Sequence, residues 1–243
     1  MATAEGGADR PTRGRAGAEP PGAMGRGAIV AAALFVLASL AIAAVALAQV
    51  GLTATVPVHW GVDGQPDGYG AAWLSLLVVP VVQVGLVALL AVIPRFEPRR
   101  ANLARSRRSY EIVVVGVAAL FTLVQAGLAI ATLGGEFDVS RIIVAGSGVF
   151  FIAIGLAMPG FKPNYMAGIR TPWTLTSDLS WRKTHVLGGR LFMLVGALVV
   201  VASPFLPVLA LTLLYVGGLL AAVVVTVVYS YRVWRTDPDR RAA

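Results

Sequence analysis

The chain has 243 residues, of which 57% are hydrophobic and only 13% are charged, and its formal net charge is +8. A soluble domain carries about 25% charged residues, so this composition excludes an ordinary soluble protein. The chain contains no cysteine, which excludes disulfides, thiolate metal ligands and cysteine nucleophiles.

Residues 1–26 are rich in Gly, Ala, Pro and Arg and show no apolar periodicity, which is typical of a disordered tail. Six apolar blocks follow, each near the ~20 residues that cross a bilayer as a helix. Backbone groups inside lipid must be satisfied within the segment, so helices are the expected spanning elements. The blocks cover residues 27–50, 73–93, 112–133, 142–161, 186–203 and 208–231. The sequence therefore predicts an all-α polytopic membrane protein with about six transmembrane helices.

The first apolar block ends in Ala46-Leu47-Ala48, which is similar to a signal-peptidase site. A signal peptide has an apolar region of only ~7–15 residues, and this block is longer. We therefore expect an uncleaved helix. The last two blocks meet at Ser203-Pro204-Phe205-Leu206-Pro207, where two prolines indicate a tight turn.

The lysines and arginines predict how these spans are oriented. If the connections alternate between two sides, nineteen of the 20 basic residues fall on one side and only Arg141 falls on the other. The positive-inside rule places the basic side, and with it both termini, in the cytoplasm. The predicted organisation is a cytoplasmic tail (1–26), an N-terminal membrane region (27–111), a C-terminal membrane region (112–231) and a second cytoplasmic tail (232–243).

The first external loop, residues 51–72, combines turn residues with aromatic ones. Two Asp-Gly steps and one Gln-Pro step indicate tight turns, so we expect a compact, ordered loop. It could be a recognition surface for a peptide or small ligand, or a folded cap anchored by interfacial aromatics. The candidate recognition residues are Pro57, His59, Trp60, Asp67 and Tyr69.

A metal in this loop would need His59, Asp63 and Asp67 as ligands. One histidine and two carboxylates, with no second histidine nearby, are a weak pattern for a metal site. We therefore expect neither a metal nor another cofactor.

The second cytoplasmic connection, residues 94–111, contains six arginines. Such a cluster sets the topology and attracts anionic lipid headgroups at about 1 kcal/mol per charge. The alternative interpretation is a docking surface for an acidic partner.

The segment 162–185 contains the densest pattern of turns, aromatics and cations in the chain. Its two motifs read KPNYMAGIRTPWTL and WRKTH. Gly160 and Pro163 are expected to end the preceding helix, and Gly168 permits a tight turn. Thr176 or Ser177 can cap a new helix, with an acidic residue in its first turn.

If that new helix continues directly into the fifth span, its residues form defined stripes. Trp181, His185, Gly188 and Phe192 then share one face of the helix. Gly188-Gly189 would allow a neighbouring helix to approach closely. No nucleophile or second carboxylate can be grouped with His185, so we interpret it as a structural or binding histidine and not as a general base.

The spans themselves are poor in ionisable residues. Apart from Arg190 near a helix end they contain none other than tyrosine, and Gln49, Gln83 and Gln125 are the main polar groups. Proton and ion relays need intramembrane Asp, Glu or His, so the sequence argues against a proton-coupled pump. The glutamines could form interhelical hydrogen bonds, or they could line the path of a permease.

The motifs at 162–165, 168–175, 181–185 and 188–190 together resemble the SdpI family of bacterial membrane proteins. The Pro-Val-His-Trp and Gly-Gln-Pro-Asp-Gly-Tyr sequences of residues 57–60 and 64–69 resemble an N-terminal domain of unknown function often found in that family. The resemblance implies a non-enzymatic protein of the bacterial plasma membrane that gives immunity to a secreted peptide toxin. It also implies signal transduction by holding a cytoplasmic transcriptional repressor, without direct binding of nucleic acid.

The candidate partner-binding or family-motif residues lie in the two motifs of the 162–185 segment. They are Asn164, Tyr165, Gly168, Arg170, Thr171, Pro172, Trp173, Trp181, Arg182, Lys183 and His185. The alternative function is a small-molecule permease or channel-like protein in the same bilayer.

Overall fold

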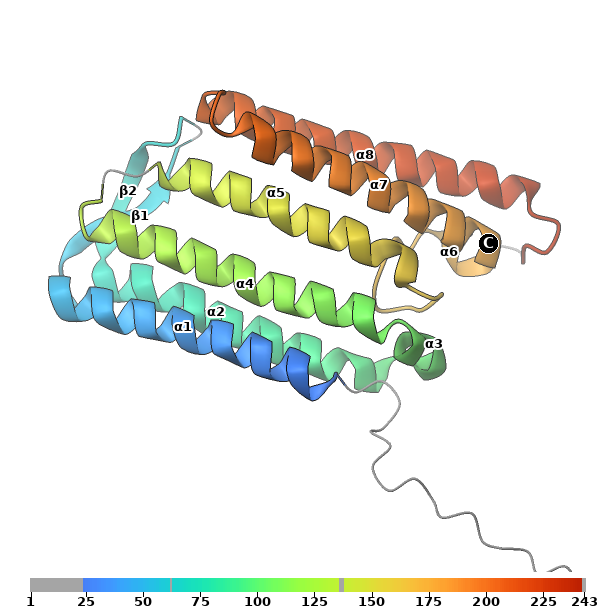
Figure 1. Cartoon of the computed structure of the whole chain (residues 1–243), viewed down its shortest axis with the longest axis horizontal. Coiled ribbons are helices and arrows are strands. Elements are labelled where there is room, and N and C mark those ends of the chain that lie inside the picture. The colour runs from blue at the N-terminus through green and yellow to red at the C-terminus, as the bar shows by residue number, and fades with distance from the viewer. Residues whose placement is uncertain (1–23, 62, 136–137, 242–243) are drawn as a thin grey trace, which may run out of the picture.

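The computed structural model of the chain describes residues 24–61, 63–135 and 138–241 (Figure 1). Within these residues, six helices are long and apolar enough to cross a membrane, which confirms the predicted class and the number of spans. They are α1 (Arg26–Val50), α2 (Ala72–Val92), α4 (Arg107–Thr132), α5 (Val139–Ala157), α7 (Asp178–Ala202) and α8 (Val208–Thr236). Most of the predicted N-terminal tail, residues 1–23, lies outside the described residues.

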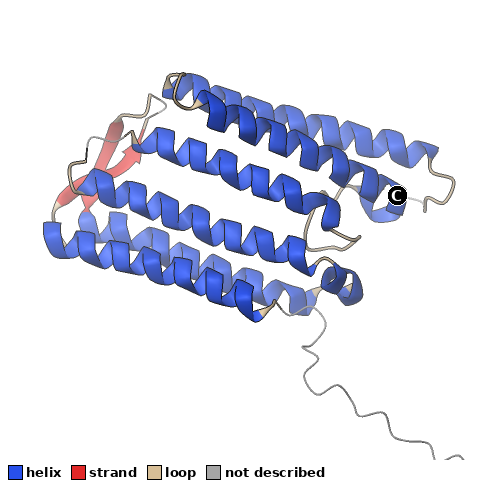
Figure 2. Cartoon of the chain, in the orientation of Figure 1, coloured by secondary structure: helices blue, strands red, loops and turns tan. Residues whose placement is uncertain are grey.

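The six helices run side by side, so that the connections lie at two opposite ends of the bundle (Figure 1). We call one the basic end: α1, α4 and α7 begin there, and α2, α5 and α8 end there. The described N- and C-terminal residues both lie at this end, as six spans require. We call the other the hairpin end, because the two strands lie there (Figure 2).

The helices form two groups of three. In the first group, α1, α2 and α4 pack against one another, and in the second, α7 packs against α5 and α8. The contact of α4 with α5 joins the groups. Each group therefore contains helices that are close in sequence, and the long-range organisation depends on one central helix pair.

The strands β1 (Thr55–Trp60) and β2 (Pro66–Ala71) form an antiparallel hairpin. The sequence predicts an ordered loop here, and its turn residues are where we expect them, but the paired strands were not predicted. The register shifts on both sides of His59, so the pairing is irregular and too short to give a clear alternating pattern. The hairpin leads directly into α2, whose first residue Ala72 is fully buried.

Several helix boundaries differ from the predicted blocks at the basic end. The 94–111 connection contains the 3₁₀ turn η1 (Ile93–Phe96) and the short helix α3 (Arg100–Arg105), and a second 3₁₀ turn, η2 (Met158–Gly160), follows α5. The fifth span begins at Asp178, well before residue 186, and the last helix continues to Thr236, so residues 232–236 are helical and not tail. A prediction from apolar runs omits these helical turns, because their residues are polar and lie outside the apolar stretch.

Two glycine pairs bring α5 and α7 into close contact. A Cβ on Gly155 would lie 2.5 Å from the carbonyl oxygen of Gly189, and a Cβ on Gly189 would lie 2.5 Å from that of Gly155. Gly148 and Gly196 face each other in the same reciprocal way. The two glycines in each helix are seven residues, or two helical turns, apart, so one face of each helix contacts the other helix at two points along its length.

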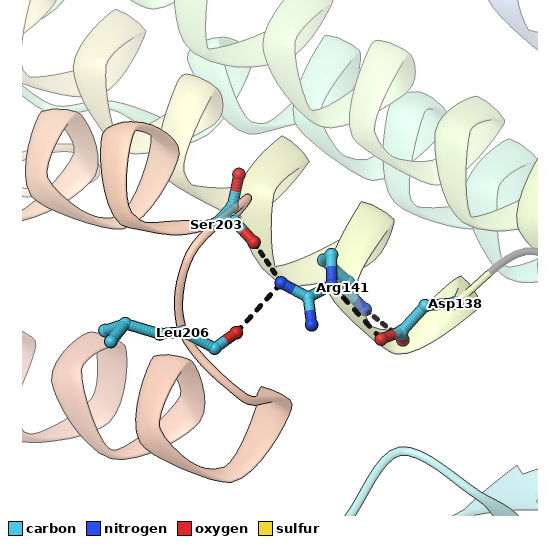
Figure 3. Close-up of polar contacts among 4 residues, drawn as sticks. All are labelled: Asp138, Arg141, Ser203 and Leu206. Carbon is cyan, nitrogen blue, oxygen red and sulfur yellow. Dashed lines mark hydrogen bonds and ion pairs between the residues drawn. The ribbon is translucent and has the colours of Figure 1, made fainter.

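Arg141 closes the second group at the hairpin end (Figure 3). Its side chain donates to the Asp138 carboxylate and to the carbonyl oxygens of Ser203 and Leu206. These carbonyls belong to the tight turn between α7 and α8, which the two prolines predict correctly. The cation thereby satisfies acceptors that the end of α7 leaves without helical partners.

Candidate functional site

The predicted site residues lie in two places at opposite ends of the bundle. The 162–185 segment lies at the basic end, between η2 and α7, and includes the short helix α6 (Pro172–Thr176). The hairpin residues lie at the other end, so the structure does not bring the two sets together. Any communication between them must pass through the helices.

Asn164 folds the first turn of the segment. Its Oδ1 accepts hydrogen bonds from the N–H groups of Met166 (2.9 Å) and Ala167 (2.7 Å), and its Nδ2 donates to the carbonyl of Lys162 (2.8 Å). The side chain is fully buried. An asparagine that satisfies three backbone groups of its own loop determines the loop's shape.

Glu97 supports this loop from the arginine-rich connection, and the sequence analysis missed it. Its buried carboxylate accepts the N–H of Tyr165 (3.0 Å) through one oxygen and the N–H of Arg99 (2.8 Å) through the other. The Arg99 guanidinium in turn donates to the Tyr165 hydroxyl (3.1 Å) and lies 4.6 Å from the centre of its ring. Glu97 is one of only two acids in the arginine-rich connection, the other being Glu111, and this contrast is the sequence signal that could have singled it out.

Two further side chains of the same connection hold the start of the segment. Asn102 donates to the carbonyl of Pro163 at 2.7 Å, and Ser106 Oγ accepts the N–H of Lys162 at 2.8 Å. The 94–111 connection is therefore more than a row of cations, because it is the surface on which the motif loop rests.

Two backbone groups fix the His185 ring. Nδ1 lies 2.8 Å from the carbonyl oxygen of Trp181, which can only accept, and Nε2 lies 3.0 Å from the N–H of Ile169, which can only donate. Nδ1 therefore carries the proton and the ring is neutral. Both nitrogens are occupied, which leaves neither one for a reacting substrate.

Gly168 makes this arrangement sterically feasible. Its φ is +109°, a conformation that residues with a Cβ rarely adopt, and a Cβ at this position would overlap His185 Nε2. The sequence predicts a turn at Gly168, and the structure adds the reason for close approach.

Trp181 packs beneath the motif loop. Its indole is fully buried, its Nε1 donates to the carbonyl of Phe161 at 2.8 Å, and its ring is stacked on His185 with a centroid separation of 4.1 Å. The predicted stripe faces the interior, because Trp181, His185 and Gly188 are buried and Phe192 is half-buried. α7 is continuous from Asp178, as the stripe requires.

Caps define the two helices of the segment. Thr171 and Thr174 form a reciprocal capping box at the start of α6, and Thr171 Oγ1 also lies 3.1 Å from Ser230 Oγ of α8. Pro172 occupies the first turn of α6, where its missing N–H costs nothing. The Trp173 ring lies 5.1 Å from that of Tyr231, so α6 contacts α8 through its cap residue and through its first turn.

Ser177 caps α7, as the sequence predicts, and joins it to the C-terminal residues. Its Oγ accepts the N–H of Ser180 at 2.9 Å and donates to the Asp237 carboxylate. This hydroxyl, the N–H of Asp239 and the positive charges of Arg240 and Arg182 hold the pKa of Asp237 below its ordinary value. Asp237 was not predicted, because the sequence places it in a tail.

The segment thus divides into a buried half and an exposed half. Asn164, Trp181 and His185 are buried and determine the fold of the loop. The side chains that reach the surface of the basic end include four cations and one aromatic. They are Lys162, Tyr165, Arg170, Arg182 and Lys183, which we call the basic rim.

The hairpin divides in a similar way. Pro57 accepts a hydrogen bond from Ser75 through its carbonyl (3.1 Å), and Trp60 packs against the core beneath the strands. His59 and Asp67 are exposed and form a pair across the strands at 2.5 Å, and Tyr69 is 61% exposed. Asp63 turns instead to the N–H of Gln65.

Metal-binding groups are not assembled at either site in the described part of the chain. No three His, Asp or Glu side chains converge there, and the two nearest candidates, His59 and Asp67, bond to each other. At both ends, exposed polar and aromatic side chains lie over an ordered, buried support.

Two family models match the chain and together span half of it. Residues 160–230 match the SdpI/YfhL protein family, and residues 34–84 match a domain of unknown function, DUF1648. The C-terminal region of the chain therefore resembles the SdpI/YfhL family. The immunity protein SdpI of Bacillus subtilis (strain 168) is 25% identical to it over 177 residues, which cover 72% of this chain and 82% of that protein. No solved structure matches the chain.

Each matched region covers all or part of two helices of one group and leaves out α4 or α5, which join the groups. The SdpI/YfhL match begins at the motif segment and extends through α7 into α8, and the other match covers most of α1, the hairpin and half of α2. Glu97, Asn102 and Ser106 fall between the two matches. Part of the support of the family motif therefore comes from a region that neither match covers.

Proposed function

We propose that this protein is a non-enzymatic immunity protein that protects its cell from a secreted antimicrobial peptide. The observation that carries the proposal is the likeness to a protein named for immunity, which extends over most of both chains. The protein crosses the bacterial plasma membrane six times, with the basic end and both termini in the cytoplasm. The concentration of cations at one end supports this orientation.

The hairpin end meets the peptide. His59, Asp67 and Tyr69 supply exposed polar and aromatic groups for recognition, while Pro57 and Trp60 hold the hairpin on the bundle. The hairpin continues directly into α2, so a ligand bound to it acts on a spanning helix.

The basic rim meets a cytoplasmic repressor. Four exposed cations around Tyr165 complement an acidic protein surface, and electrostatic complementarity speeds encounter and selects partners. Signal transduction then requires that peptide and repressor each bind one of two helix arrangements more tightly. The α4–α5 contact between the two helix groups is where such arrangements would differ.

Catalysis finds no support at the basic end. Both nitrogens of His185 bond to backbone groups, and the Glu97 carboxylate is fully buried against two N–H groups. Neither group can reach a substrate without unfolding the loop. This is why we propose binding as the function of the segment.

The permease alternative lacks its predicted path. Gln83 donates to the carbonyl of Ala118 and Gln125 to that of Leu76, so both act as interhelical hydrogen-bonding groups. Gln49 is exposed at the hairpin end of α1. The three side chains do not share one channel.

The test is survival of a sensitive bacterial strain that expresses the chain, challenged with a panel of membrane-active peptides. We expect protection against at least one peptide, and loss of it in the His59→Ala/Tyr69→Ala variant at equal membrane abundance. An Arg170→Gln/Arg182→Gln variant should keep protection and lose induction of a repressor-controlled reporter. Unchanged survival across a broad panel refutes immunity, and unaltered induction in the second variant refutes the role of the basic rim.

A further inference from the structure

A groove of about 790 Å³ lies between α1 and α2 at the basic end. Its walls are apolar side chains of α1 from Ile29 to Leu37 and of α2 from Val84 to Ala91. Alanines occupy positions 32, 33, 88 and 91, so the two helices cannot fill the space between them. The groove is a product of small side chains on both walls.

The groove is as long as one leaflet of a bilayer. Ile29 and Leu37 are eight positions apart, which is ~12 Å along a helix. From Val84 on α2 to Arg95 is eleven residues, or ~16 Å if the helical rise is kept. Half of the hydrocarbon core of a membrane is ~15 Å thick. The groove therefore matches the length of one acyl chain in the leaflet at the basic end, and its apolar walls match the hydrocarbon around such a chain.

Two arginines stand at the mouth of the groove. Arg95 and Arg100 both line it and both are exposed. Arg100 donates to the carbonyl oxygen of Arg95 at 3.0 Å, and within the described residues neither guanidinium is in an ion pair. The neighbouring Phe96 is 70% exposed, as an aromatic at headgroup level is. Two unpaired cations above an apolar slot complement a phosphate attached to an acyl chain.

Other occupants fit less well. Residues 1–23 contain no large apolar side chain except Met1, so their sequence offers nothing to fill an apolar slot. A soluble anion would use the arginines and leave the slot unused. An anionic phospholipid uses both parts.

We propose that this groove is a binding site for one anionic phospholipid, with an acyl chain between α1 and α2 and the phosphate held by Arg95 and Arg100. The site adjoins the support of the motif loop, because Arg100 begins α3 and Asn102 of the same helix holds Pro163. Bound lipid thus restrains the element on which the family motif rests. The site does not depend on the proposed immunity function.

The test measures binding of dioleoylphosphatidylglycerol to the full-length chain in phosphatidylcholine nanodiscs, by titration of the lipid fraction with native mass spectrometry. The variant is Arg95→Gln/Arg100→Gln, and the matched control is Arg105→Gln/Arg108→Gln, which removes two exposed arginines of the same connection outside the groove. We expect the first pair to weaken binding roughly 30-fold, as two cations near an anionic headgroup imply. The control pair should change it less than threefold.

A second variant tests the apolar half. Ala33→Leu/Ala88→Leu fills the slot and keeps all charges, and it should abolish bound phosphatidylglycerol while the chain elutes as a folded monodisperse protein. Equal weakening by both arginine pairs would show diffuse attraction and overturn the site. Unchanged binding in the leucine variant, or binding that rises when residues 1–23 are removed, would overturn the acyl chain as the occupant.

Discussion

Gly168→Ala tests whether the contact between Gly168 and His185 holds the motif loop. An alanine at φ +109° is strained by about 1–2 kcal/mol. Its Cβ also displaces the His185 ring and leaves the buried N–H of Ile169 unpaired, which costs about 1–3 kcal/mol more. The variant should therefore lose about 2–5 kcal/mol of unfolding free energy.

The assay is equilibrium unfolding of the purified chain in detergent micelles. Gly51→Ala is the control for backbone strain alone, because Gly51 has φ +84° and no neighbour within 4 Å of an added Cβ, so only a strain of about 1–3 kcal/mol applies. In a His185→Ala background the cost of Gly168→Ala should fall to the control value, since the displaced ring is gone. Equal costs for Gly168→Ala and Gly51→Ala in the wild-type background would refute the reasoning.

Three further predictions address other parts of the structure. Gly189→Ala should destabilise the chain by more than 1 kcal/mol, because the added Cβ meets the α5 backbone. Gly217→Ala should not, because the space around Gly217 is open. Thermal melting curves of the two variants test the difference. The folded pKa of Asp237 lies below its unfolded value of about 3.9, so its stabilisation is complete above that value and lost as pH falls through the folded pKa. Asp237→Asn should therefore flatten the acid limb of a melting-temperature profile, and an unchanged limb would contradict this. The chain has no cysteine, so Tyr69→Cys should react with an impermeant maleimide on intact cells and Arg170→Cys should not; the opposite labelling would reverse the orientation.

The spans and caps were predictable from sequence because their causes are local. A run of apolar residues must be helical in lipid, and Ser177, directly before the first residue of α7, was one of two local candidates for its cap. The shared face of Trp181 and His185 followed from helical spacing on the condition that α7 is continuous, and the structure meets that condition. Each of these inferences needs only residues within two turns of a helix.

The partners of the motif loop were not predictable, because they come from distant parts of the chain. Glu97 bonds to Tyr165 across 68 positions, and no periodic pattern encodes that pairing. The strands of the hairpin were not predicted for another reason. Pro57 and the irregular register at His59 remove the alternation that identifies a strand. The sequence predicts a structural or binding role for His185, and only the structure shows that two backbone groups hold its ring.

The position of Arg141 has an electrostatic consequence for the whole hairpin end. Its guanidinium is used on Asp138 and on two carbonyls of a turn, so it projects little positive charge outward. The exposed charges that remain on the hairpin include the carboxylates of Asp63 and Asp67. Among the described residues of this end, the carboxylates of Asp63, Asp67 and Asp138 outnumber the one arginine, and such an excess attracts cations over a Debye length of about 8 Å. A cationic peptide would arrive at this face faster than a neutral or anionic one of the same size.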